Sequence, residues 1–92
     1  MIAKRHIRFS STDFYFEITV VVKKLSIGYK IEESYEFKQN KYSREICNHS
    51  SCCLWTDPIE DVASKVFNEK IKDVSWRKFG SNDYIHKNFL KY

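Results

Sequence analysis

The sequence is poor in the two residues that most often interrupt regular structure, with two glycines and one proline among 92 residues. It is 42% hydrophobic and 16% aromatic, so it lacks the composition of a disordered chain. This length suits one small domain, and we expect residues 1–92 to form a single α+β domain. Such a domain leaves little room for an enclosed substrate pocket, which disfavours an enzyme.

Long hydrophobic runs are also missing. The longest apolar stretch, residues 18–22, is far too short to span a bilayer. The N-terminal residues lead into alternating polar and apolar positions, unlike the continuous apolar run of a signal peptide. Three cysteines cannot all pair within one chain, which fits the reduced thiols of an intracellular compartment. We therefore expect a cytoplasmic protein with no membrane partner.

Catalytic signatures are absent as well. Cys52 or Cys53 could act as a nucleophile only with a base nearby, and His49 is the only local candidate. Their immediate neighbours supply no positive charge to lower a thiol pKa. Glu32 and Glu33 would lie on opposite faces of a strand, so they could not cooperate as acid and base. We expect no enzymatic activity and no cofactor.

Apolar alternation is the main feature that is present, and it predicts strands in the first half of the chain. Apolar residues occupy even positions over residues 14–22 and odd positions over residues 25–37. This change of phase requires a turn or bulge near residues 23–28. Gly28 suits that bend because it tolerates a positive φ.

Three further strands are expected on either side of this pair. Residues 3–9 are typical of an edge strand protected by charge, although the same edge could pair with a second copy in a homodimer. Two short strands, about residues 42–47 and 52–55, are expected to flank a turn at residues 48–51. The whole first half is predicted to be an antiparallel β-meander of three to five strands.

A helix start divides the chain at residues 56–60. Asp57 can accept from free backbone N–H groups, Pro58 fits the first helical position, and Glu60 completes a pattern that resembles a capping box. We expect an amphipathic helix from Pro58 to about Asp73 that packs on one face of the sheet. Its predicted apolar stripe is Ile59, Val62, Ala63, Val66, Phe67, Ile71 and Val74, with Trp76 and Phe79 continuing the core contact and a short second helix in the tail.

Thiol and imidazole groups concentrate in one short segment, and thiolate with imidazole is a ligand set for zinc. The candidate metal ligands are Cys47, His49, Cys52 and Cys53. Structural zinc sites usually take paired ligands from two separated segments, and this chain has one cluster. We therefore keep a zinc-stabilised hairpin as an alternative. The main interpretation is a hairpin with His49 on its turn and the cysteines as small hydrophobic residues.

Positive charge lies at both ends of the chain, and the net charge is +4. Residues 1–12 contribute +3, residues 13–64 contribute −3 and residues 65–92 contribute +4. If the two basic ends met in space, they could form one surface that attracts the phosphates of a nucleic acid. That candidate set is Lys4, Arg5, Arg8, Arg77, Lys78, Lys87 and Lys91; the alternative is an ordinary solvated basic face.

Fifteen aromatic residues are more than a core of this size can easily hide. We expect some of them at an interface, where Tyr and Trp contribute much of the binding energy. The predicted partner-binding residues are Tyr29, Tyr35, Trp76 and Tyr84, while cross-strand packing of the tyrosines is the alternative.

Residue types with AT-rich codons are abundant. Lys, Ile, Asn, Phe and Tyr supply 39 residues, whereas Gly, Ala, Pro and Arg supply 9. This bias fits a low-GC bacterium or one of its phages. Together with the small size, it favours a non-enzymatic interaction protein that binds a larger protein or nucleoprotein complex, for example a phage-encoded inhibitor or modulator of a host system. A nucleic-acid-binding module and a zinc-stabilised domain are the alternatives.

Overall fold

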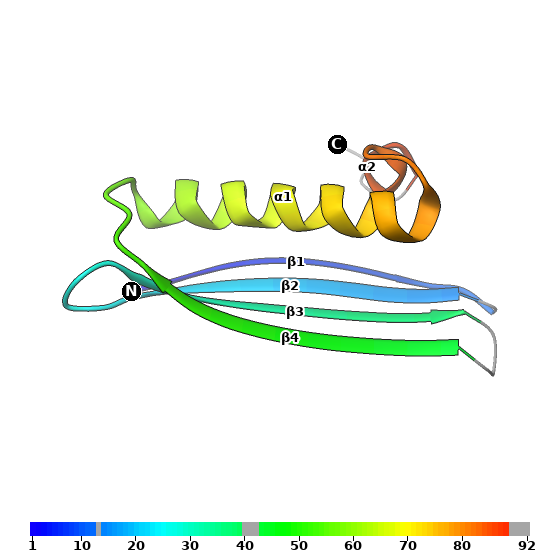
Figure 1. Cartoon of the computed structure of the whole chain (residues 1–92), viewed down its shortest axis with the longest axis horizontal. Helices are drawn as coiled ribbons and strands as arrows, with labels where there is room; N and C mark the ends of the chain where they lie inside the picture. The colour runs from blue at the N-terminus through cyan, green and yellow to red at the C-terminus, as the bar shows by residue number, and fades with distance from the viewer. Residues whose placement is uncertain (13, 40–42, 89–92) are drawn as a thin grey trace.

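The computed structural model describes residues 1–12, 14–39 and 43–88, which form one sheet and two helices (Figure 1). The strands are β1 (Ile2–Ser10), β2 (Phe14–Lys24), β3 (Tyr29–Gln39) and β4 (Ser43–Cys53), and the helices are α1 (Ile59–Phe79) and α2 (Tyr84–Asn88). This arrangement confirms the predicted α+β class, with a helix packed on one face of an antiparallel meander. Neither helix in the described part of the chain is long and apolar enough to cross a membrane.

The four strands follow chain order across the sheet, and every neighbouring pair is antiparallel. The strands β1 and β4 are therefore the two edges. α1 contacts β1 and β2 and lies along the same face of both (Figure 1). Because the helix covers this half of the sheet, the β4 side is left comparatively open.

The core lies between α1 and the helix-side face of the sheet. In β2 the even positions from Phe16 to Val22 are buried, and their partners in β1 and β3 include Ile7 and Tyr35, which both lie opposite Ile18. All seven residues of the predicted helical stripe are buried, as its 3.6-residue period requires. Five phenylalanines extend this core toward the β1–β2 turn through ring contacts: Phe9, Phe14, Phe16, Phe37 and Phe79.

The predicted change of phase is a tight turn between β2 and β3. The Leu25 N–H donates to the Gly28 carbonyl at 3.1 Å, and Gly28 has φ 77°. A Cβ on Gly28 would lie 2.0 Å from the Cys53 carbonyl oxygen, so this position needs glycine both for its φ and for the close approach. The bend is confirmed, but β3 begins at Tyr29, so Leu25 and Ile27 belong to the turn rather than to a strand.

The prediction of two short strands around a turn at residues 48–51 is wrong. All of Ser43–Cys53 is one continuous strand, in which Asn48 pairs with Ser34 and His49 with Glu33. Polar residues such as Asn and Ser favour turns locally, but a complete ladder with β3 outweighs that preference. Tyr42, the expected start of the first short strand, lies outside the described residues.

α1 begins and ends differently from the prediction. Pro58 occupies the N-cap, where no side chain caps the helix, and its carbonyl accepts from the N–H groups of Asp61 and Val62. The expected capping by Asp57 and Glu60 is therefore wrong. The helix continues past Asp73 to Phe79 and ends at Gly80, whose φ of 69° and N–H bond to the Trp76 carbonyl form a left-handed C-cap.

The segment after α1 folds back onto it. Phe79 packs against the core as predicted, but Trp76 is 61% exposed, because it lies about 200° around the helix from the buried Val74. The expected second helix is α2. The buried hydroxyl of Ser75 accepts from the backbone N–H groups of Tyr84 and Ile85 and thereby fixes the start of α2 on α1.

Candidate interaction surfaces

Exposed apolar side chains gather at one end of the molecule. The start of β1, the β2–β3 turn and the segment after β4 lie together there (Figure 1). Five of the eight large hydrophobic residues that are exposed in the described chain belong to these segments, and we call them the apolar tip: Met1, Ile2, Leu25, Ile27 and Leu54. An exposed cluster of this kind is typical of an interaction site, whereas single exposed hydrophobics are common and carry no meaning.

The apolar tip is held by backbone contacts between its three segments. The Lys24 N–H donates to the Met1 carbonyl at 3.0 Å, which joins the start of β1 to the turn. Gly28 lies against the backbone of Cys53 and Leu54, which joins the turn to the segment after β4. Because the strands pair up to the turn, Ile27, 74% exposed, is presented from a fixed backbone. Such preorganisation lowers the entropy cost of binding.

Lysines surround the apolar tip. The ammonium group of Lys24 lies 4.8 Å from the centroid of the Tyr29 ring, and those of Lys23 and Lys30 lie 3.3 and 3.4 Å from Glu32 Oε1. The hydrogen bond from Lys23 is the main reason that the pKa of Glu32 is lowered. Glu32 pairs with two of these three lysines, so the four charged side chains together carry a net charge of +2.

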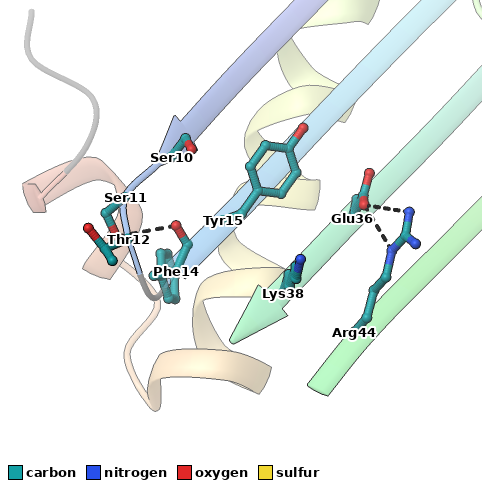
Figure 2. A pocket seen from close by; sticks show the side chains of 8 residues that line it. All are labelled: Ser10, Ser11, Thr12, Phe14, Tyr15, Glu36, Lys38 and Arg44. Carbon is teal, nitrogen blue, oxygen red and sulfur yellow. Dashed lines mark hydrogen bonds and ion pairs between the residues drawn. The ribbon is translucent and has the colours of Figure 1, made fainter. Parts of the chain in front are cut away.

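The second candidate site is a hollow on the outer face of the sheet, at the end opposite the apolar tip. It has a volume of about 400 Å³ and is lined by side chains of β1, β2, β3, β4 and the β1–β2 turn (Figure 2). The Glu36 carboxylate accepts from Arg44, with Oε1 3.1 Å from Nε and 3.0 Å from Nη2. Lys38 lies beside this ion pair, and Tyr15 lies across the hollow from it.

The hollow offers weak anion binding at most. Two cationic side chains line the hollow, Arg44 and Lys38. Arg44 is already paired with Glu36, so Lys38 is the one that could bind an anion. Desolvation, followed by the charges of Glu17 and Glu36, raises the pKa of Tyr15, so this phenol stays protonated at neutral pH and cannot act as a base. The lining residues therefore provide no activated nucleophile with a base beside it.

The four predicted partner-binding aromatics divide into two pairs. Tyr29 and Tyr35 are 6% and 1% exposed, so the expectation that their rings lie on the surface is wrong; they are core residues. Trp76 and Tyr84 are exposed, and the Tyr84 ring stacks on Phe79 with centroids 4.4 Å apart. These two lie toward the end of α1 that is remote from the apolar tip (Figure 1).

The basic residues predicted to bind nucleic acid do not form one face. Lys4 and Arg8 alternate with Arg5 along β1, so they lie on the outer face of the sheet while Arg5 lies on the helix side. Arg5 Nη2 is 2.6 Å from Glu60 Oε2, which ties this guanidinium to α1.

The remaining members of that set lie on the helices or beyond them. Arg77 pairs with Asp73 at 3.0 Å, and Lys78 pairs with Glu45. Lys87 is exposed on α2, and Lys91 lies outside the described residues. Three of the seven predicted cations are thus committed to carboxylates, which reduces the positive charge available to phosphates.

The cysteine and histidine cluster lies along β4. Side chains alternate across a strand, so Cys47, His49 and Cys53 face the helix side of the sheet and Cys52 faces the outer side. All three cysteines are free thiols. No group of three or more potential ligands in the described part of the chain is close enough to hold a metal ion, so the zinc-stabilised hairpin within one chain is wrong.

Sequence reasoning missed the apolar tip because it assigned Leu25 and Ile27 to a strand face. A signal was present, since Gly28 directly follows Ile27 and the phase of the pattern changes just before Leu25. Apolar residues inside a predicted turn indicate exposure, because a turn has no buried face. Comparison with protein-family models, curated proteins and solved structures gave no match to this chain.

Proposed function

We propose that this protein is a small non-enzymatic binding protein that inserts its apolar tip into an apolar groove of a larger protein or nucleoprotein complex. The observation that carries the proposal is the gathering of five exposed hydrophobic residues on three segments whose backbones are in contact. Ile27 is the most prominent anchor, because it projects from the end of a hairpin. An apolar anchor that fills a pocket is the usual centre of a binding hot spot.

The charge around the tip defines the chemistry of the partner. Lys23, Lys24 and Lys30 lie at the strand ends that flank the β2–β3 turn, and Glu32 pairs with two of them. A groove with acidic side chains at its rim would complement this pattern and would speed association at low salt. The exposed Trp76 and Tyr84 remain predicted contacts of a second, separate region, because they lie toward the other end of α1.

If the same groove also binds another ligand of the partner, the domain would compete with that ligand and so act as an inhibitor or modulator. The domain would then act by occupying that groove, without chemistry of its own. The three free thiols fit a reducing compartment, so we place the protein in the cytoplasm, or in the host cytoplasm if a phage encodes it.

The test is a comparison of two exposed isoleucines, Ile27 in the tip and Ile46 on the outer face of β4. A photocrosslinking residue at each position, in a host lysate treated with nuclease, would identify the partner by mass spectrometry. We then expect Ile27→Ser to weaken binding of the purified partner at least tenfold, which corresponds to about 1.4 kcal/mol. Ile46→Ser is the control and should leave the affinity of a single chain unchanged.

The opposite results are equally clear. Equal loss of affinity in both variants, or crosslinking only from position 46, would show that the tip is not the docking surface. In a parallel lysate without nuclease, recovery of nucleic acid that disappears at high salt would support the alternative function, because phosphate contacts depend steeply on salt. A tip-mediated complex should persist in high salt, since burial of apolar surface is not screened.

A further inference from the structure

The two edges of the sheet differ in how they are protected. β1 carries Lys4, Arg5, His6 and Arg8, and charge on an edge strand discourages pairing with another chain. β4 carries no Asp, Glu, Lys or Arg from Ile46 to its end at Cys53, and it contains no proline. In the described part of the chain β4 pairs only with β3, so its outward N–H and C=O groups have no strand partner. β4 is therefore an edge suited to strand addition.

We propose that β4 pairs antiparallel with β4 of a second copy of this chain and that the pair completes a metal site. The midpoint of Ser43–Cys53 is Asn48. When the two-fold axis passes through Asn48, every residue of one β4 strand therefore has a partner in the other β4 strand. It places Arg44 opposite the second copy's Cys52 and Glu45 opposite its Ser51, so no like charges face each other.

Space for the second copy follows from the position of α1. The helix backbone lies over β1 and β2, and β3 and β4 lie toward the free edge, where side chains from the C-terminal end of α1, such as Lys78, reach Glu45 of β4 (Figure 1). In the two-fold pair both helices lie on the same face, above strands that are about six spacings, or roughly 29 Å, apart. A helix with its side chains is about 10–12 Å wide, so the two helices leave an open trough between them.

The same register brings four metal ligands together on the floor of this trough. Residue 47 of one copy lies opposite residue 49 of the other, so each Cys47 faces the second copy's His49. All four side chains lie on the helix side of the joined sheet. Opposite Cβ atoms are about 5 Å apart and diagonal ones about 7–8 Å, a span that one ion with cysteine and histidine ligands can bridge.

The chemistry of the ligands indicates zinc. Two thiolates and two imidazoles form a tetrahedral Cys₂His₂ set, which is a common structural zinc site. Each Cys47 thiol gives its proton to solvent when the sulfur binds the ion. Glu33 lies directly opposite His49 in the β3–β4 ladder, on the same face. Its carboxylate is placed to accept from the imidazole nitrogen that does not bind metal, an arrangement that orients zinc-binding histidines.

The site is incomplete in one chain, which explains why the predicted ligand set did not converge. Cys52 faces the outer side, and Cys53 pairs at the far end of the ladder, opposite the second copy's Ser43. Only Cys47 and His49 lie beside the two-fold axis. The inference is independent of the proposed function, because neither residue belongs to the apolar tip.

The first test measures mass and metal content of the full chain, kept reduced, with zinc and with a chelator. We expect a dimer with one zinc ion per two chains and a shift toward monomer when the chelator removes it. Cys47→Ser and His49→Ala should abolish zinc-dependent dimerisation, whereas Cys52→Ser, an exposed cysteine on the other face, should not. Zinc bound by the monomer, or a dimer unaffected by chelator and by His49→Ala, would overturn the metal site.

The second test measures the register with zinc present, in a variant that keeps Cys47 and His49 and has Cys52 and Cys53 replaced by serine. Asn48→Cys places a thiol opposite its own mate and should form an intermolecular disulfide on mild oxidation. Ser50→Cys is the control on the same face, because residue 50 lies opposite residue 46 and about 13 Å from its own mate. Equal crosslinking of both variants, or none from position 48, would overturn the two-fold pairing.

Discussion

Tyr35 offers a direct test of the core. Its side chain is 1% exposed, and its hydroxyl oxygen has no hydrogen-bond partner among the described residues. A buried polar group without a partner costs about 1–3 kcal/mol. Tyr35→Phe removes the hydroxyl and keeps the ring. We expect the free energy of unfolding to rise by about 1 kcal/mol, the lower end of that range, because the lost oxygen leaves a small gap with fewer dispersion contacts.

Tyr29 is a matched control in the same strand. It is also buried, but its hydroxyl donates to the Asp57 carbonyl at 2.6 Å. Tyr29→Phe therefore removes a hydrogen bond that holds the segment before α1. We expect that variant to lose about 1 kcal/mol, the typical net value of one intramolecular hydrogen bond. The two identical substitutions should thus have opposite signs.

Urea unfolding followed by tryptophan fluorescence and circular dichroism would measure both changes. In thermal unfolding of the same variants, a change of 1 kcal/mol in the free energy of unfolding would move the melting temperature of a domain of this size by about 4–8 °C. Burial, and then the charge of Glu45, raises the pKa of Tyr35, so its hydroxyl stays neutral at the pH of the assay. If Tyr35→Phe lowers the midpoint as much as Tyr29→Phe, with unchanged slope, the Tyr35 hydroxyl has a partner and the argument fails.

Two further substitutions test the turn and the helix junction. Gly28→Ala should lower the free energy of unfolding at least twice as much as Gly80→Ala. Both glycines have a positive φ, which costs alanine roughly 1–2 kcal/mol. Of the two, Gly28 alone lies where an added Cβ would meet backbone atoms. Equal losses in chemical denaturation would contradict the close approach to Cys53. Ser75→Ala leaves the first N–H groups of α2 without their acceptor and should cost about 1–3 kcal/mol. In this variant the amide hydrogens of residues 84 and 85 should show a much larger increase in exchange rate than the amide hydrogens of the sheet. An unchanged rate at residues 84 and 85 would refute the role of Ser75.

The elements that the sequence predicted well are those with one buried and one exposed face. β2 and α1 each carry an uninterrupted period, of two and 3.6 residues, because a single neighbouring layer covers each of them. Local patterns are sufficient for such elements. The end of α1 was predicted at about Asp73, six residues too early, because the stop signal is Gly80 and the periodicity weakens before it.

β4 could not be predicted in the same way. Its residues are mostly exposed on both faces, so no apolar period marks it, and only the ladder with β3 makes it a strand. Long-range pairing of this kind is not visible in local sequence. The expected exposure of Tyr29 and Tyr35 was wrong for a related reason: a tyrosine in an alternating strand can face the core or the solvent, and both residues follow the apolar phase of β3.

The two proposed surfaces have a geometric relation that follows from β4 itself. The strand ends at Cys53, directly before Leu54 of the apolar tip. Pairing about Asn48 therefore places the two tips at opposite ends of the joined ladder. Eleven residues at about 3.3 Å each separate them by roughly 36 Å. A target with two grooves at that spacing would bind both tips at once, and the second contact would gain from a high effective concentration. Zinc at Cys47 and His49 would then control avidity without touching the residues that make the contact.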